Sequence, residues 1–224
     1  MTFAQPISPA NRPIRQAAIA RNRAKVDPSK AIANISTILD TATEDEWRDG
    51  TYWYESAHDI AVQVGVNLFG RGAHSANHAT VKGAAIIAAL SPQVSWDLNV
   101  TRAIAFSNGH DIASLSDGIN KAIRIRDGEN PATVLGGRKV RSFWSNIVGN
   151  LNAVTIDRHA VAIAVGRPVT DSYVKCLERI GCYTQLAGYY RTVARREGLK
   201  PAEIQAITWL AWRRLYQWDR ADVF

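Results

Sequence analysis

The 224-residue sequence lacks most features of membrane, secreted and metal-dependent proteins. The spacing of its two cysteines, Cys176 and Cys182, fits neither a zinc cluster nor a disulfide framework, which predicts reduced thiols, no metal and no cofactor. Its longest apolar run, residues 83–90, is far shorter than the roughly 20 residues of a membrane-spanning helix. The N-terminus lacks the apolar core of a signal peptide. We therefore expect a cytoplasmic protein without membrane contact, and nothing in the sequence indicates an obligate protein partner.

Alternation of apolar and polar residues, the pattern of a half-buried strand, is also missing. Apolar residues instead recur at helical spacing along the chain, which predicts an all-α fold. Pro92 ends one Ala/Gly-rich helix, Ser95 is the expected N-cap of the next, and Pro201 is expected in the first turn of the last. A short helix is expected within residues 108–130. The other expected helices span residues 31–39, 57–68, 76–90, 96–106, 140–148, 158–165, 171–180 and 184–197.

Positive charge exceeds negative charge, and the formal net charge is +7. Such an excess favours a polyanionic partner, because clustered cations displace counterions from phosphates. Residues 1–30 are predicted to form a basic N-terminal arm, followed by one folded domain over residues 31–224. A solvated tail that only aids solubility is the alternative for the arm. Against one acidic residue, Asp27, the arm carries Arg12, Arg15, Arg21, Arg23, Lys25 and Lys30.

Asp157 is the strongest candidate for a catalytic carboxylate. It stands at the start of the helix predicted to end at Gly166. Backbone amides and the positive end of the helix dipole stabilise an ionised carboxylate at this position. Such an anion can stabilise positive charge on a sugar whose bond to a base is breaking, or activate a water molecule. Aspartate is also a common N-cap without any catalytic role.

Three segments together resemble the helix-hairpin-helix DNA glycosylase superfamily, and endonuclease III in particular. Residues 135–139, Leu-Gly-Gly-Arg-Lys, are similar to the family's Gly-rich hairpin ending in Gly-Arg-Lys. Residues 155–159, Thr-Ile-Asp-Arg-His, follow at similar spacing and resemble the family's Val-Asp-Thr-His motif, whose aspartate is catalytic. Residues 90–99 are similar to its Leu-Ser-Ala-Gln segment and the Asn-bearing helix that follows. The hairpin is shorter here, and Arg158 replaces the usual threonine.

The resemblance implies a two-lobed helical fold with a central cleft, one lobe comprising about residues 46–150 and the other residues 31–45 with 151–224. It implies DNA as the partner, in the nucleoid of a bacterial or phage-infected cell, and Asp157 as the catalytic residue. Lys139 would attack the sugar as a nucleophile, giving lyase activity, or would contact a phosphate. For Trp96, core packing is the alternative to base stacking. The implied nucleic-acid-binding residues are Gln93, Trp96, Asn99, Gly136, Gly137, Arg138, Arg158 and His159.

Three functions are consistent with this pattern. The first is a DNA glycosylase that flips a damaged or modified base and cleaves its N-glycosidic bond. The second is a base-hypermodifying enzyme similar to phage thymine pyrophosphorylases, for which Arg138, Lys139 and Arg158 would bind phosphate. The third is a non-catalytic DNA-binding protein. Elsewhere, His58 and Asp59 form either an acid/base pair or a helix start, and no metal-binding role is expected for the other histidines.

Overall fold

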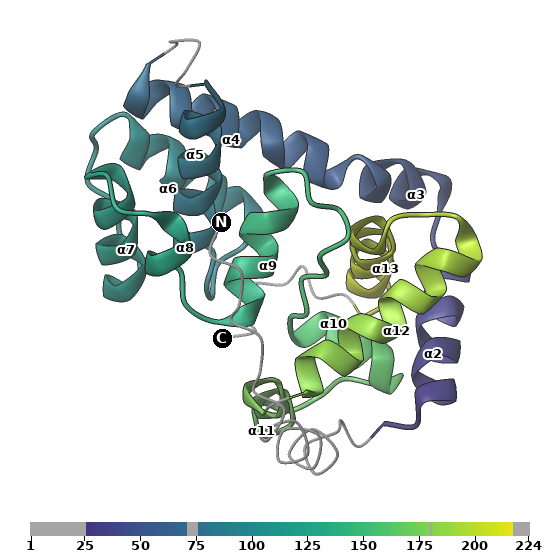
Figure 1. Ribbon diagram of the computed structural model, residues 1–224. Helices are drawn as coiled ribbons and strands as arrows, with labels where there is room; N and C mark the ends of the chain where they lie inside the picture. The colour runs from purple at the N-terminus through teal and green to yellow at the C-terminus, as the bar shows by residue number, and fades with distance from the viewer. Residues whose placement is uncertain (1–25, 71–75, 180, 217–224) are drawn as a thin grey trace, which may run out of the picture.

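The computed structural model describes residues 26–70, 76–179 and 181–216, and these residues are helical without any strand (Figure 1). The predicted all-α fold is therefore confirmed. The first six helices are α2 (Pro28–Asp40), α3 (Glu44–Thr51), α4 (Trp53–Phe69), α5 (Ala76–Leu90), α6 (Trp96–Ser107) and α7 (Ser116–Arg126). The others are α8 (Pro131–Val134), α9 (Arg138–Ile147), α10 (Arg158–Val165), α11 (Asp171–Val174), the 3-10 helix η2 (Lys175–Glu178), α12 (Cys182–Glu197) and α13 (Pro201–Tyr216). Within the described ranges, no helix has the length and apolarity needed to cross a membrane.

Glycine allows α4 and α5 to pack unusually closely. A Cβ atom on Gly65 would lie 2.2 Å from the carbonyl oxygen of Ala79, and one on Gly83 would lie 2.1 Å from that of Ala61. Real Cβ atoms do not approach backbone this closely, so each position requires glycine at the present helix separation. The Ala-rich face of α5 is buried, as expected for a central, tightly packed helix.

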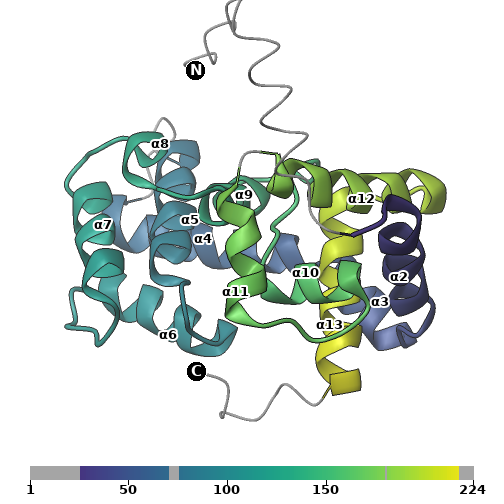
Figure 2. The same cartoon turned by 90° about the horizontal axis from the view of Figure 1, so that it is seen from below.

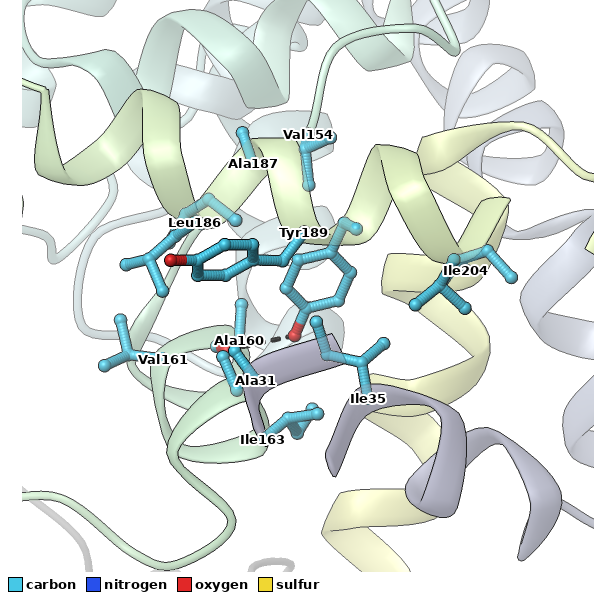
Figure 3. Packing of buried hydrophobic residues seen from close by; sticks show 14 of the residues in the cluster. Ala31, Ile35, Val154, Ala160, Val161, Ile163, Leu186, Ala187, Tyr189 and Ile204 are labelled. Carbon is cyan, nitrogen blue, oxygen red and sulfur yellow. Dashed lines mark hydrogen bonds between the residues drawn. The ribbon is translucent and has the colours of Figure 1, made fainter. Parts of the chain in front are cut away.

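The buried apolar side chains form two clusters. One is built mainly from α4 to α9, and the other from α2, α10, α12 and α13. Figure 3 shows part of the second cluster, where Ile35 and Leu186 pack with Val154 and Ile163. In both Figure 1 and Figure 2, α9 lies between α6 and α7 on one side and α12 and α13 on the other.

Helix α13 contributes side chains to both clusters. Ala202 and Ala206 belong to the cluster of α4 to α9, whereas Ile204, Ile207 and Trp212 belong to the other. The two sets point in different directions because residues four apart share a helix face. Helix α4 also contacts α3 and α13 at one end and α5 and α6 along its length. These two helices therefore join the clusters.

Several predicted boundaries differ from those observed. Helix α2 begins at Pro28, where the side chain of Asp27 accepts a hydrogen bond from the Lys30 amide at 3.0 Å. The last residues of the predicted arm, 28–30, thus form the first helical turn, while residues 1–25 lie outside the described residues. The single helix predicted over 171–180 is instead α11 followed by η2. The helical stretch ends at Glu178, because Arg179 is extended and Gly181 has a φ of 92°, in the left-handed region.

Candidate functional site

Asp157 caps the N-terminus of α10, as its sequence position predicts. Its Oδ1 atom accepts a hydrogen bond from the Ala160 amide at 2.8 Å, and α10 ends at Gly166, whose φ is 80°. No hydrogen bond to Oδ2 is formed by any residue in the ranges 26–70, 76–179 and 181–216. One carboxylate oxygen therefore fixes the side chain while the other remains available to a ligand.

The segment that leads to Asp157 is held on two sides. On α9, the buried Asn146 donates to the carbonyl oxygens of Asn150 and Ala153, each at 2.9 Å, and its Oδ1 accepts from the Thr155 hydroxyl at 2.8 Å. These contacts use both amide hydrogens of the Asn146 side chain and one of the two lone pairs of its Oδ1 atom. The carboxylate is thereby positioned relative to α9.

Tyr183 of α12 holds the other side of the same segment. Its hydroxyl donates to the Val154 carbonyl oxygen at 2.8 Å and accepts from the Ile156 amide at 3.0 Å. Burial raises the pKa of Tyr183, so the phenol stays protonated and continues to donate.

A cavity of about 120 Å³ adjoins Asp157. An apolar cavity of roughly 150 Å³ holds a benzene molecule, so this one is of the size of a single planar ring. Trp53 and Trp96 stand with ring centroids 4.7 Å apart, and Phe143 lies 6.0 Å and 6.2 Å from them. The aromatic side chains that line the cavity are Trp53, Tyr54, Trp96, Phe143 and Trp209.

Polar groups complete the lining, and they come from distant parts of the chain. Of the described residues around the cavity, Asp157 supplies the carboxylate and Lys139, in the first turn of α9, supplies the cation. Lys139 is exposed, which marks the side on which the cavity reaches the surface. Asn99 and Gln205 are buried and add two amides. The cavity thus combines flat apolar walls with an anion and a cation.

Four of the ten residues predicted from the sequence meet at this cavity, namely Trp96, Asn99, Lys139 and Asp157. Trp96 is half-buried and packs on the core, and it also lines the cavity. The other six lie outside the lining. Gln93 is exposed on the loop between α5 and α6, with a φ of 60° that is uncommon for a non-glycine residue.

The remaining predicted residues flank the site. Gly136 and Gly137 form an exposed turn before α9, and the φ of Gly137 is 69°. The Arg138 guanidinium donates to the Thr184 hydroxyl at 3.2 Å, whereas Arg158 forms an ion pair with Asp171. His159 is outside the lining, and its ring is perpendicular to that of the lining residue Trp209 at a centroid distance of 6.2 Å. His58 contacts the Ile147 carbonyl oxygen at 2.8 Å, a structural role on α4.

The charged groups around Asp157 affect the pKa of the neighbouring residue His159. Burial is the largest influence and lowers the pKa of this imidazole below its usual value. Asp157 acts in the opposite direction, while Arg213, Lys139 and Arg158 lower the pKa further. The imidazole beside Asp157 is therefore held neutral near pH 7.

We expect His159 to make the folded state less stable in acid. Its folded-state pKa lies below the unfolded value of about 6.5, so the unfolded chain binds more protons as the pH falls through this window. The free energy of unfolding should therefore decrease below about pH 6.5. Urea unfolding at about pH 7.5 and about pH 5.5 measures this. The change should be smaller in His159→Gln and unaltered in His110→Gln, which replaces an exposed histidine. Equal pH dependence of wild type and His159→Gln would contradict the expectation.

Sequence reasoning missed several lining residues, the principal ones being Trp53, Tyr54, Phe143, Gln205 and Trp209. Phe143 lies in the helix predicted over residues 140–148, and a tryptophan on an apolar helix such as the last one is ordinarily buried in the core. Trp209 is in fact half-buried, with the Arg213 guanidinium 4.4 Å from its ring centroid. The cluster of aromatic residues at 52–54 was the available signal.

The chain belongs to the family of unknown function DUF7178, whose profile matches residues 17–215. That span includes every residue of the cavity. No curated protein and no solved structure matches the chain. The described residues contain no group of three or more histidine, cysteine, aspartate or glutamate side chains arranged to hold a metal ion.

Proposed function

We propose that this protein is a DNA glycosylase of the helix-hairpin-helix type, which takes one flipped base into the cavity and cleaves its N-glycosidic bond. The observation that carries the proposal is that Asp157 and Lys139 line the same aromatic-walled cavity, which has the size of one planar ring. Enzymes that act on a base within a duplex must extrude it into such a pocket. Aromatic walls favour this step because they replace the stacking that the base loses.

In the proposed reaction, Asp157 acts on the sugar. As the base leaves with the bonding electron pair, positive charge develops on the sugar ring, and a fixed carboxylate stabilises that charge or activates the attacking water. The hydrogen bond from the Ala160 amide and the braces from Asn146 and Tyr183 keep the carboxylate in place beforehand. A pre-positioned charge needs no reorganisation during the reaction.

Exposed cations support a DNA partner. Arg138 and Lys139 occupy the first turn of α9 and are both exposed, and Lys139 lines the cavity. Contacts from such residues to phosphates would orient the duplex without recognising its sequence. The net charge of +7 agrees with this role.

The same geometry favours base release over base hypermodification. A pyrophosphate-displacing enzyme would need several cations directed into its pocket. Arg158 is instead paired with Asp171, and Arg138 donates to Thr184, so neither lines the cavity. Lys139 is the cation that the described lining contains. The non-catalytic alternative is separated from both by the assays below.

The direct test is an assay of wild-type protein on duplex oligonucleotides that each carry one uracil, hydroxymethyluracil, oxidised, alkylated or mismatched base. We expect at least one of them to yield a free base and an abasic site. Formation of a modified nucleoside without an abasic site would support hypermodification instead. Salt-dependent binding without any chemical change in DNA would support a binding protein.

A second measurement concerns Lys139. If its amine attacks the sugar, the base leaves and an imine joins the protein to DNA, which borohydride reduces to a stable adduct. We expect this adduct with wild-type protein and its loss in Lys139→Ala. The matched control is Lys200→Ala, which removes an exposed lysine that does not line the cavity. An adduct that persists in Lys139→Ala would exclude this lysine as the nucleophile, leaving it a phosphate contact.

A further inference from the structure

Asn99 of α6 holds a buried hydrogen-bond acceptor without a partner. The residue is 2% exposed, and its Oδ1 atom forms no hydrogen bond with any described residue. Buried polar atoms are nearly always paired, because an unpaired one loses its bond to water without replacement. The same residue lines the aromatic-walled cavity. A residue of the cavity lining therefore carries a buried acceptor that no described residue uses.

The orientation of the Asn99 amide follows from its other contact. Nδ2 lies 3.2 Å from the carbonyl oxygen of Ile87. A carbonyl oxygen only accepts, so the amide nitrogen must face it, and rotating the amide would set two acceptors against each other. Oδ1 is thereby fixed as an acceptor.

Gln205 of α13 adds the complementary group. Its Oε1 accepts a hydrogen bond from the Tyr54 hydroxyl at 2.9 Å, which leaves the Nε2 donor for another partner. Gln205 is also buried and lines the same cavity. The lining residues therefore carry one unused acceptor, Asn99 Oδ1, and one amide donor, Gln205 Nε2. The edge of a pyrimidine, which carries a donor next to an acceptor, matches this pair.

We infer that Asn99 is a specificity-determining residue, and that its Oδ1 accepts a hydrogen bond from a ring N–H or amino group of a pyrimidine base bound in the cavity. This inference rests on the proposed function for the identity of the ligand as a base. The cavity volume of about 120 Å³ suits one ring rather than the two fused rings of a purine. The aromatic lining would contact the ring, and Asn99 would select the base by its edge.

Free bases test the inference without requiring catalysis. Tryptophan indole N–H signals of the full chain are followed by NMR during titration with uracil, 3-methyluracil, cytosine and N4,N4-dimethylcytosine, where methylation removes the donor. We expect uracil or cytosine to bind at least about tenfold more tightly than its methylated partner. Equal affinity within both pairs, or no binding of any of the four, would overturn the inference.

Substitutions test whether the preference for the unmethylated base depends on Asn99. In Asn99→Ala the preference should fall to within about twofold, because the acceptor is gone and the methyl group has room. Asn120→Ala, which replaces an exposed asparagine of α7, should keep it. Should the alanine variant fail to fold, Asn99→Leu keeps the volume and should still weaken the unmethylated base. An unaltered preference in either folded variant would refute the role of Asn99. Base release from DNA is measured in parallel, so selective binding without release would reject only the proposed enzyme, and release without selectivity only the inference.

Discussion

Asp157→Asn should slow base release from DNA by at least about 100-fold, because it removes the negative charge that faces the developing positive charge on the sugar. Asparagine is as good an N-cap as aspartate, so its side-chain oxygen can still accept the 2.8 Å hydrogen bond from the Ala160 amide. Stability should therefore change by less than about 1 kcal/mol. Single-turnover release of the base, measured beside urea unfolding, separates chemistry from folding.

A matched control comes from the other described helix that an aspartate caps in the same way. Asp27 accepts a hydrogen bond from the Lys30 amide at 3.0 Å at the start of α2, away from the cavity. Asp27→Asn therefore repeats the charge loss and the retained cap without touching the site. Base release should be unchanged in this variant. Full activity in Asp157→Asn would contradict the assignment of Asp157 as the catalytic carboxylate. If neither the wild-type protein nor Asp27→Asn releases a base, the result would favour a non-catalytic DNA-binding protein.

Gly83→Ala is expected to lower the free energy of unfolding by about 3 kcal/mol. The added Cβ would lie 2.1 Å from the carbonyl oxygen of Ala61 and 2.8 Å from the Gly65 nitrogen. These are backbone atoms of α4, which cannot rotate aside as a side chain would, so the two helices must separate and leave packing gaps. Urea unfolding followed by circular dichroism measures the loss.

The opposite sign is expected for Gly188→Ala. Gly188 lies inside α12, where a Cβ would meet no atom within 4 Å. Alanine there should stabilise the helix by up to about 1 kcal/mol, since glycine loses more backbone freedom on folding. The pair thus compares the same substitution with and without a close backbone contact. Equal stabilities of Gly83→Ala and wild type would mean that α4 and α5 lie farther apart than described here.

The fold class and many helix boundaries could be predicted because they depend on local chemistry. Helix α5 spans the predicted residues 76–90, and Ser95 caps α6 as expected, accepting from the Leu98 amide at 3.4 Å. Helix α3 was missed although Thr43 and Glu46 form a capping box at its start. Its polar sequence has no apolar stripe, since its buried contact with α13 is made by Gly50. Periodicity cannot reveal a contact made by backbone.

Prediction of the site was partial for a related reason. Asp157 and Lys139 stand in recognisable local motifs, so their candidacy followed from nearby sequence. Other residues of the lining could not be found from nearby sequence. Tyr54 and Gln205, for example, are 151 positions apart and meet only through tertiary packing. Sequence alone would place Trp209 in the core, since a tryptophan on an apolar helix is usually buried there. Single-sequence patterns do not distinguish a wall of the core from a wall of a cavity.

The placement of α13 between the two apolar clusters has a consequence for any attempt to shorten the protein. Gln205 and Trp209 reach the cavity from this last described helix, whereas Trp53 and Tyr54 reach it from near the opposite end of the described chain. A fragment that stops before α13 would keep most of the α4 to α9 cluster but would lack one side of the cavity. A continuous piece that holds all of its walls must include residues 53–209, from α4 to α13, which lie within the DUF7178 match at 17–215.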